Sequence, residues 1–174
     1  MTGFDLLNVL ALVVSVAAFA TSIFVARRQL KLTQDSNVLP IIIDVFKETR
    51  TLEFSRSIEF VRDELSTRYR PDDGYRNLPE QAKVHIRRVG LFYDDVGKLV
   101  AHQIVDEQLV LGSYGAAVVK MWDRLAPFVY AERQRHGNLT MTYFEDLASR
   151  AHGTSMRDIH RNIRLRRRPP TMPQ

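Results

Sequence analysis

A charge-free stretch near the N-terminus constrains the fold of this chain more than any other feature of its sequence. Residues 9–26 contain no Asp, Glu, Lys or Arg, and the stretch extends back to Leu6 if Asn8 is tolerated. A helix of this length, at about 1.5 Å per residue, covers most of a hydrocarbon layer about 30 Å thick. The sequence therefore predicts a transmembrane helix.

Two other interpretations of this stretch are a cleaved signal peptide and the buried core helix of a soluble protein. A nominal A-x-A cleavage site occurs at residues 18–20. A signal peptide should begin with positive charge, however, whereas the N-terminal flank here has Asp5 and no Lys or Arg. We therefore favour a retained anchor.

The residues after the stretch predict its orientation. The sequence "SIFVARRQLK" changes from apolar to basic at Arg27, Arg28 and Lys31. Because basic flanks stay on the cytoplasmic side, these three residues predict a membrane boundary, with the N-terminus outside and the rest in the cytoplasm. Small residues recur every three or four positions over 11–26. This pattern permits close helix pairing, but it is also common in spans that never pair.

The rest of the chain carries helix signals and almost no strand signals. We expect a polar joint at residues 33–37, followed by a helix with Asn37 as its cap and Pro40 in its first turn. Apolar residues spaced by three and four over 54–65 predict an amphipathic helix, either continuous with the preceding one or separate. Residues 70–78 combine Pro, Gly, Asp and Asn, which predicts a loop.

Further helices are expected beyond this loop. One begins at Pro79 and has an apolar stripe made of Val84, Val89, Phe92, Val96, Leu99 and Val100. The next begins at an Asp106 cap and ends at Gly137 in the left-handed conformation. A short helix over about 142–151 completes the set.

The helix that follows Asp106 carries two special features. Its run 109–119 is apolar on all sides and too short to span a membrane, so we expect it at the centre of the bundle. Gly112, Gly115 and Ala116 in this run would let a neighbouring helix approach closely. Pro127 should kink the helix.

These signals predict an all-α fold, with one N-terminal transmembrane helix followed by an antiparallel bundle of about four helices. The predicted domains are residues 4–32 for the anchor and its basic extension, 38–153 for the cytoplasmic bundle, and 154–174 for a basic, flexible tail. The chain has no cysteine, which excludes disulfides and thiolate metal sites.

The positive charge of the chain lies in this tail. Residues 154–174 carry six arginines and one aspartate, so the tail alone has a charge of +5, while the other 153 residues hold 19 basic and 19 acidic side chains. A nucleic-acid surface across the body is therefore not implied. Met156, Ile159 and Ile163 share a helical face, so the tail could bind anionic lipid, nucleic acid or an acidic protein, or stay solvated. The basic residues of the tail are Arg157, Arg161, Arg164, Arg166, Arg167 and Arg168.

No catalytic signature is present in the sequence. The nearest approach to a ligand cluster is Asp94, Asp95, His102 and Asp106, where one helix is expected to end and the next to begin. A carboxylate metal site in a helical bundle needs Glu and Glu-x-x-His elements repeated on facing helices, and these are missing. We expect these residues to be caps and solvated faces, with no cofactor; a metal-dependent enzyme or effector that uses them is the alternative.

Four residues of the helix after Asp106 are candidate surface contacts. Trp122, Arg124, Tyr130 and Arg133 lie around an aromatic cluster that either packs in the core or forms a groove for a partner. The hypothesis that we favour is a non-enzymatic protein-interaction or regulatory module that binds a protein partner or itself. A membrane-perturbing effector is another alternative.

Four sequence segments carry a resemblance to a known family: "VARRQL", "VFKETRTLEFSRSIEFVRDEL", "VGLFYDDVGKLVAHQIVDEQLV" and "MWDRLAPFVYAERQR", which together cover about residues 20–136. With them the chain resembles an uncharacterised bacterial family of small proteins with an N-terminal membrane helix and a helical cytoplasmic domain, domain of unknown function 4760. The resemblance implies this architecture, a location in the bacterial inner membrane, and no particular activity.

Overall fold

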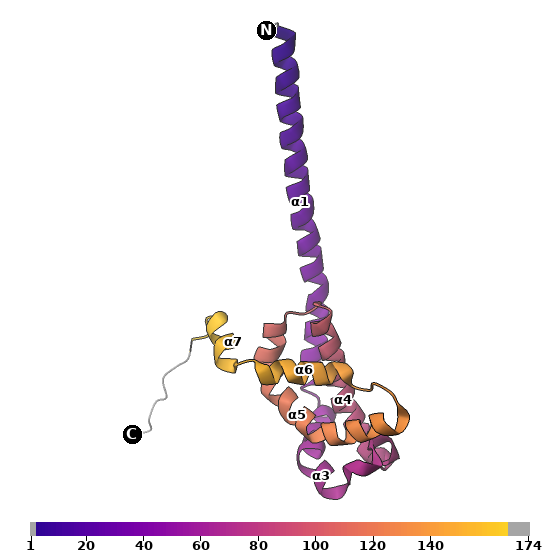
Figure 1. The fold of residues 1–174 in the computed structure, drawn as a ribbon. Helices are drawn as coiled ribbons and strands as arrows, with labels where there is room; N and C mark the ends of the chain where they lie inside the picture. The colour runs from indigo at the N-terminus through magenta and orange to yellow at the C-terminus, as the bar shows by residue number, and fades with distance from the viewer. Residues whose placement is uncertain (1–2, 167–174) are drawn as a thin grey trace, which may run out of the picture. The chain divides into compact units, whose positions relative to one another are not determined.

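The computed structural model describes the backbone of residues 3–166, and their side chains except those of residues 3–9, 28, 30–38 and 73. Every regular element within residues 3–166 is helical, and none is a strand, which confirms the all-α class. The chain divides into two compact units, Met1–Asp44 and Val45–Gln174. Figure 1 shows the order of the helices along the chain.

The first unit is formed by α1 (Gly3–Glu48), a long helix that ends in the second unit. The helix is continuous through residues 33–37 and through Pro40, so the predicted joint and the predicted Asn37 cap are wrong. Polar residues such as Thr, Ser, Asp and Asn are only moderately poor helix formers, and without a glycine they do not stop a helix.

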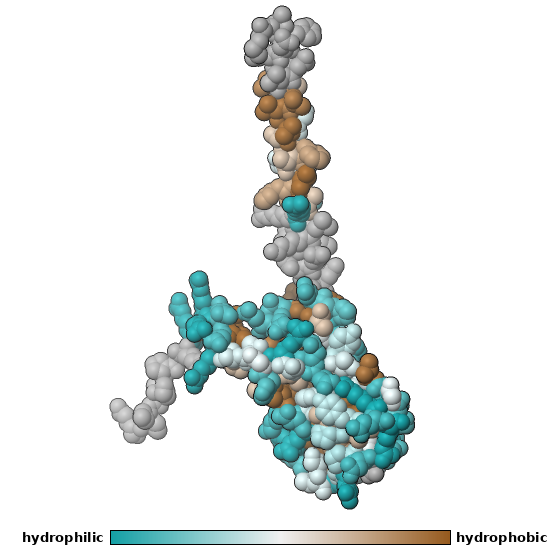
Figure 2. Space-filling view, in the orientation of Figure 1, coloured by the Kyte–Doolittle hydropathy of each residue, from teal (hydrophilic) through white to brown (hydrophobic). Residues whose placement is uncertain are grey.

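The apolar part of α1 is long enough to cross a membrane. Its window Leu10–Arg27 has a mean hydropathy of 2.0, and none of the window is buried. Figure 2 shows the hydrophobic colour along this part of α1. Two hydroxyls on it are satisfied inside the helix, since Ser15 Oγ donates to the Ala11 carbonyl and Thr21 Oγ1 to the Ala17 carbonyl, both at 2.8 Å. Such internal bonding suits a hydroxyl in hydrocarbon.

The second unit contains the last residues of α1 and, after a turn at 49–51, an interrupted helix. The interrupted helix comprises α2 (Leu52–Glu59), the π-helical turn η1 (Phe60–Glu64) and α3 (Leu65–Arg68). Thr51 separates this helix from α1, because its Oγ1 accepts a hydrogen bond from the Phe54 N–H at 3.1 Å. The predicted amphipathic helix is therefore confirmed, as a helix separate from α1.

The predicted loop contains two short 3-10 turns, η2 (Pro71–Asp73) and η3 (Tyr75–Asn77), after which α4 (Glu80–Ala101) begins directly beyond Pro79. The predicted stripe of α4 is buried at Val89, Val96 and Val100, but its predicted first residue, Val84, is 48% exposed. Positions 82, 86 and 93 also face the core, and position 84 lies outside that stripe.

The longest helix of the second unit is α5 (Glu107–His136). Both of its predicted ends are confirmed, since Asp106 Oδ1 accepts the Leu109 N–H at 2.9 Å and Gly137 has a φ of +63°. Sequence analysis placed the apolar run 109–119 at the centre of the bundle, and this prediction is wrong for one face of α5. Leu109 is 42% exposed, whereas Leu111 and Val118 are buried, because the other helices cover only one side of α5.

Two shorter helices follow, α6 (Thr142–Gly153) and α7 (Met156–Asn162). In Figure 1 α6 lies across α4 and α5, and the α4–α6 contact is the most extensive between any two helices described. α7 packs on α5, within the segment predicted to be a flexible tail. The largest fully buried side chains include Leu65, Ile86, Tyr93, Leu111, Phe128 and Phe144.

Candidate functional site

The structure brings together three of the four candidate contact residues on α5. Trp122 packs edge-on against Tyr130, with ring centroids 6.0 Å apart, and against Phe144 of α6 at 5.1 Å. The Arg133 guanidinium lies 5.5 Å from the Tyr130 ring and 6.0 Å from the Trp122 ring. Arg124 is exposed and takes no part in this cluster.

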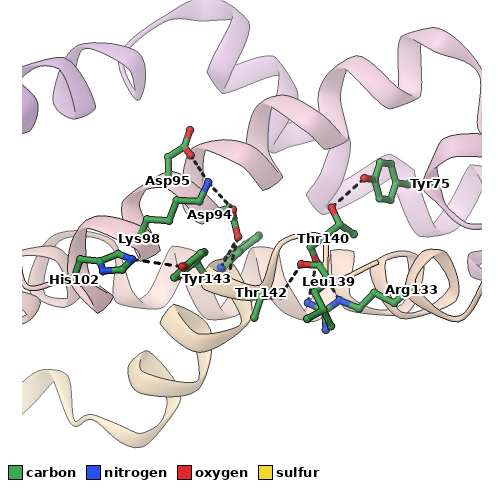
Figure 3. Close-up of polar contacts among 11 residues, drawn as sticks. Tyr75, Asp94, Asp95, Lys98, His102, Arg133, Leu139, Thr140, Thr142 and Tyr143 are labelled. Atoms are coloured by element: carbon green, nitrogen blue, oxygen red, sulfur yellow. Dashed lines mark hydrogen bonds and ion pairs between the residues drawn. The ribbon is translucent and has the colours of Figure 1, made fainter. Parts of the chain in front are cut away.

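The carboxylate of Glu145 on α6 connects this cluster to the rest of the second unit, which we call the body. Glu145 accepts a hydrogen bond from the Tyr130 hydroxyl at 2.6 Å and forms an ion pair with Arg133. Arg133 also donates to the Thr140 carbonyl from Nε and Nη2, at 3.0 and 2.9 Å (Figure 3). These contacts hold the last turns of α5 against the start of α6.

The same contacts shift two pKa values. Burial raises the pKa of Glu145, but hydrogen bonds from Tyr130 and Arg133 outweigh it and leave this pKa below its usual 4.5. The hydrogen bond to Glu145 raises the pKa of Tyr130 above its usual 10.0. At neutral pH the pair therefore consists of a carboxylate and a neutral phenol.

A cavity of about 420 Å³ opens beside this cluster, between α5 and α6. It adjoins a second cavity of about 340 Å³, because both are lined by Val119, Asp123 and His152. We call the two together the α5–α6 groove. The first cavity is also lined by Trp122, Tyr130, Glu145, Ala148 and Ser149, and the second by Gly115, Ala116, Lys120, Ala151 and Met156.

The acidic residues that sequence analysis considered as alternative metal ligands have structural partners. Asp94 is buried, and its Oδ1 accepts the N–H groups of Tyr143 and Phe144 at 3.0 and 3.1 Å (Figure 3). Lys98 Nζ lies 3.1 Å from Asp94 Oδ2 and 2.9 Å from Asp95 Oδ1. These contacts, above all the hydrogen bond to Asp95, raise the pKa of Lys98.

The other two residues considered as metal ligands, His102 and Asp106, have separate structural roles. His102 Nε2 is 3.4 Å from the Tyr143 hydroxyl, and Asp106 is the cap of α5. Across the part of the chain that the structure describes, no three His, Cys, Asp or Glu side chains converge on a possible metal position. Asp94 and Asp106 thus cap helices, while Asp95 pairs with Lys98.

Sequence analysis missed a buried glutamate near the end of α5. The Glu132 side chain is fully buried, its Oε2 accepts the Arg76 N–H at 3.2 Å, and its Oε1 lies 3.1 Å from Arg76 Nε. Oε1 has no donor with hydrogen-bond geometry, so the second contact is electrostatic. Gly74 makes room for this carboxylate, because a Cβ there would lie 2.9 Å from Oε2. The sequence signal that could have indicated this burial is the position of Glu132 among the apolar residues of one face of α5.

The basic residues predicted to mark the membrane boundary and those of the predicted basic tail lie at opposite ends of the chain. Arg27 is exposed on α1, and the side chains of Arg28 and Lys31 lie outside the described set. At the other end Arg167 and Arg168 also fall outside the described residues. The tail arginines that the structure does describe are all exposed: Arg157, Arg161, Arg164 and Arg166.

The fold defines an all-α protein with one candidate membrane helix and a compact helical body. The family model of DUF4760, a domain of unknown function, matches residues 9–151, and the chain therefore belongs to this family. The match includes the four segments that carried the resemblance, and it ends before α7. No curated protein and no solved structure matches the chain.

Proposed function

We propose that this protein is a single-pass membrane protein whose helical body, on the cytoplasmic side, is a non-enzymatic interaction or regulatory module. One observation carries the proposal: none of the apolar window Leu10–Arg27 is buried against protein. An apolar helix of this length needs an apolar environment, and hydrocarbon supplies it. Arg27, Arg28 and Lys31 favour the orientation with the body in the cytoplasm.

The polar chemistry of the body supports a role without catalysis. Asp94, Asp106 and Glu132 all accept hydrogen bonds from backbone N–H groups, so their charges stabilise the fold. A general acid or base must instead reach a substrate. What the body offers to a partner is the α5–α6 groove.

The groove has apolar walls and an acidic edge. Val119 and Ala148 lie on its walls, and Asp123 and Glu145 also line it. Glu145 is already paired with Arg133, and Lys120 lines only the second cavity, so in the first cavity Asp123 is left to attract a basic group. The groove therefore suits a partner protein segment that presents one apolar side chain next to Lys or Arg.

Cell fractionation with protease protection tests the anchor and its orientation. The full chain, tagged at its C-terminus, is compared with a chain that lacks residues 1–26. We expect the full chain in the membrane fraction with its tag protected inside the cell, and the shortened chain in the soluble fraction. A soluble full chain, or a tag digested from outside, would overturn the proposal.

Single-cysteine crosslinking tests the groove, because the chain has no cysteine of its own. A photocrosslinker on Ser149→Cys, which lines the groove, is compared in membranes with one on the exposed Leu139→Cys. We expect a discrete protein adduct from position 149 only, and its loss when Asp123→Lys is added. Equal adducts from both positions, or an adduct that survives Asp123→Lys, would contradict the groove as the contact surface.

A further inference from the structure

The C-terminal helix α7 is seated on α5 by two apolar side chains. Ile159 is buried, and its Cγ2 lies so close to Gly112 that a Cβ there would be 3.3 Å away. The Met156 Cε would lie 2.7 Å from a Cβ at Gly115. The two glycines therefore form a shallow seat, and α7 is held on the body although the DUF4760 match ends before it.

The end of α7 is closed by a hydrogen-bonded turn. The Leu165 N–H donates to the His160 carbonyl at 2.9 Å and the Arg164 N–H to the Arg161 carbonyl at 3.0 Å. This is the Schellman pattern, and Arg164 takes the left-handed position with a φ of +55°. A non-glycine residue is strained in the left-handed conformation, so this turn forms at a cost in backbone free energy. The turn fixes the positions of the neighbouring side chains.

This turn presents apolar and basic side chains together. Ile163 is 51% exposed and Leu165 is 56% exposed, beside the exposed Arg164 and Arg166. Asp158 is the one acidic residue among positions 154–174, and it pairs with Arg161 at 2.7 Å. We call Arg157, Arg161, Ile163, Arg164, Leu165 and Arg166 the C-terminal basic patch. In Figure 2 hydrophilic and hydrophobic colours lie side by side at α7.

We propose that the C-terminal basic patch binds the anionic surface of the same membrane that α1 spans. Arginines are attracted to the negative potential of an anionic leaflet, while two exposed aliphatic side chains can enter the boundary between headgroups and acyl chains. The inference rests on the proposed function, because the anchor supplies the membrane. Residues 28–44 belong to α1, where each rises about 1.5 Å, so this segment tethers the body to the bilayer and raises the effective concentration of lipid.

An anionic membrane fits this patch better than a nucleic acid does. Single-stranded RNA is bound through bases that stack on aromatic side chains, and residues 154–174 contain no Phe, Tyr or Trp. Two large aliphatic side chains held open to solvent gain nothing from a phosphate backbone. They gain burial in a lipid surface.

The test uses the full chain in nanodiscs and one environment-sensitive fluorophore at a time. Labels are placed at Ile163→Cys in the patch, at Leu139→Cys on the exposed loop before α6, and at Ala18→Cys in the apolar part of α1. We expect a blue shift of the label at 163 in discs that contain phosphatidylserine, with quenching by lipid-borne quenchers. In purely zwitterionic discs that shift should be lost, and the label at 139 should stay unchanged in both.

Charge variants test the cause of the shift. Replacing Arg157, Arg164 and Arg166 by glutamine should lower the lipid-bound population of the patch about fivefold for each arginine removed. Replacement by lysine keeps the charge and should retain binding. Because all three arginines are exposed, the fold should survive either change, which the emission of the buried Trp122 checks.

Each outcome supports or overturns a distinct claim. A label at 163 that responds equally in zwitterionic discs, or that shifts only when RNA is added, would overturn binding to anionic lipid. If the label at 18 reports hydrocarbon and the label at 163 reports water, the inference fails while the membrane anchor stands. A label at 18 in water would instead overturn the proposed function.

Discussion

Asp94 of α4 provides the N-terminal cap of α6, since its Oδ1 accepts the Phe144 N–H at 3.1 Å. The same oxygen accepts the Tyr143 N–H at 3.0 Å (Figure 3). α6 has no cap of its own, because the residue before it is Met141 in the left-handed conformation, with a φ of +56° and no side-chain hydrogen bond. A carboxylate from one helix thus completes the first turn of another, where the helix dipole also favours negative charge.

Asp94→Ala should therefore destabilise the body by about 2–3 kcal/mol, because it leaves two backbone N–H groups without an acceptor at a buried position. The free energy of unfolding can be measured by urea titration of the full chain in mild detergent. The single tryptophan, Trp122, reports this unfolding because it packs against Phe144. Asp95→Ala is the matched control: its side chain is 70% exposed, and its loss should change stability by less than about 0.5 kcal/mol.

Gly97→Ala should be more damaging than its one added carbon suggests. A Cβ at position 97 would overlap the carbonyl oxygen of Tyr143, so α4 and α6 would have to separate. We expect a loss of about 1–3 kcal/mol in the same urea titration. Gly153→Ala adds the same carbon at the end of α6 with nothing within 4 Å, and it should be neutral or slightly stabilising. Equal effects of the two substitutions would refute close packing at position 97.

Glu132→Ala should destabilise the contact between α5 and the loop before α4. The substitution empties a buried site and removes the acceptor of the Arg76 N–H, at a cost of about 2–4 kcal/mol. Glu132→Gln keeps the volume and an acceptor, so it should cost less, about 1 kcal/mol. Amide exchange of Arg76 gives a local readout, and it should accelerate more in the alanine variant than in the glutamine variant.

Glu145 predicts a pH dependence of stability. Its pKa in the folded chain lies below the usual 4.5, so its contribution is present above that value and is lost as the pH falls through the folded pKa. At pH 7 Glu145→Gln should be less stable than the natural chain by up to about 1 kcal/mol, since the side chain is 33% exposed. Urea titrations at pH 7 and at about pH 3 should show this difference shrinking at the acidic end. A difference independent of pH would mean that the charge of Glu145 is not what stabilises the contact.

Reversal of the charges that follow the apolar window tests the orientation of α1. Arg27→Glu, Arg28→Glu and Lys31→Glu together remove the cytoplasmic retention signal, so a fraction of the chains should insert with the C-terminus outside. Protease protection of a C-terminal tag measures that fraction. Neutral substitutions of Gln29 and Leu30 provide the control, and they should leave the tag protected.

The fold was predictable where one residue carries a local signal. The cap at Asp106 and the left-handed stop at Gly137 need only their own neighbours, and the structure has both. Thr51 carried a similar signal, but the spacing of the apolar residues alone left open whether the helices on either side of it were one or two. Such features follow from local backbone hydrogen bonding, which sequence order preserves.

The candidate site was less predictable, because its contacts join residues far apart in the chain. Asp94 looked like a possible metal ligand, and only the position of α6 makes it a cap. Glu132 gave no sign of its partner Arg76, 56 residues earlier. Trp122 and Arg133 were found because they belong to one helix, whereas Glu145, which binds Arg133, comes from the next. Helical spacing predicts which residues share a face, and it carries no information about what that face meets.

The cap shared between α4 and α6 also bears on the order in which the chain folds. The first turn of α6 can be completed only after α4 is in place, because its acceptor is on α4. α6 should therefore form late, after the contacts that need only neighbouring residues. In native-state hydrogen exchange, the amides of Tyr143 and Phe144 should open together with the α4–α6 contact, as one cooperative unit.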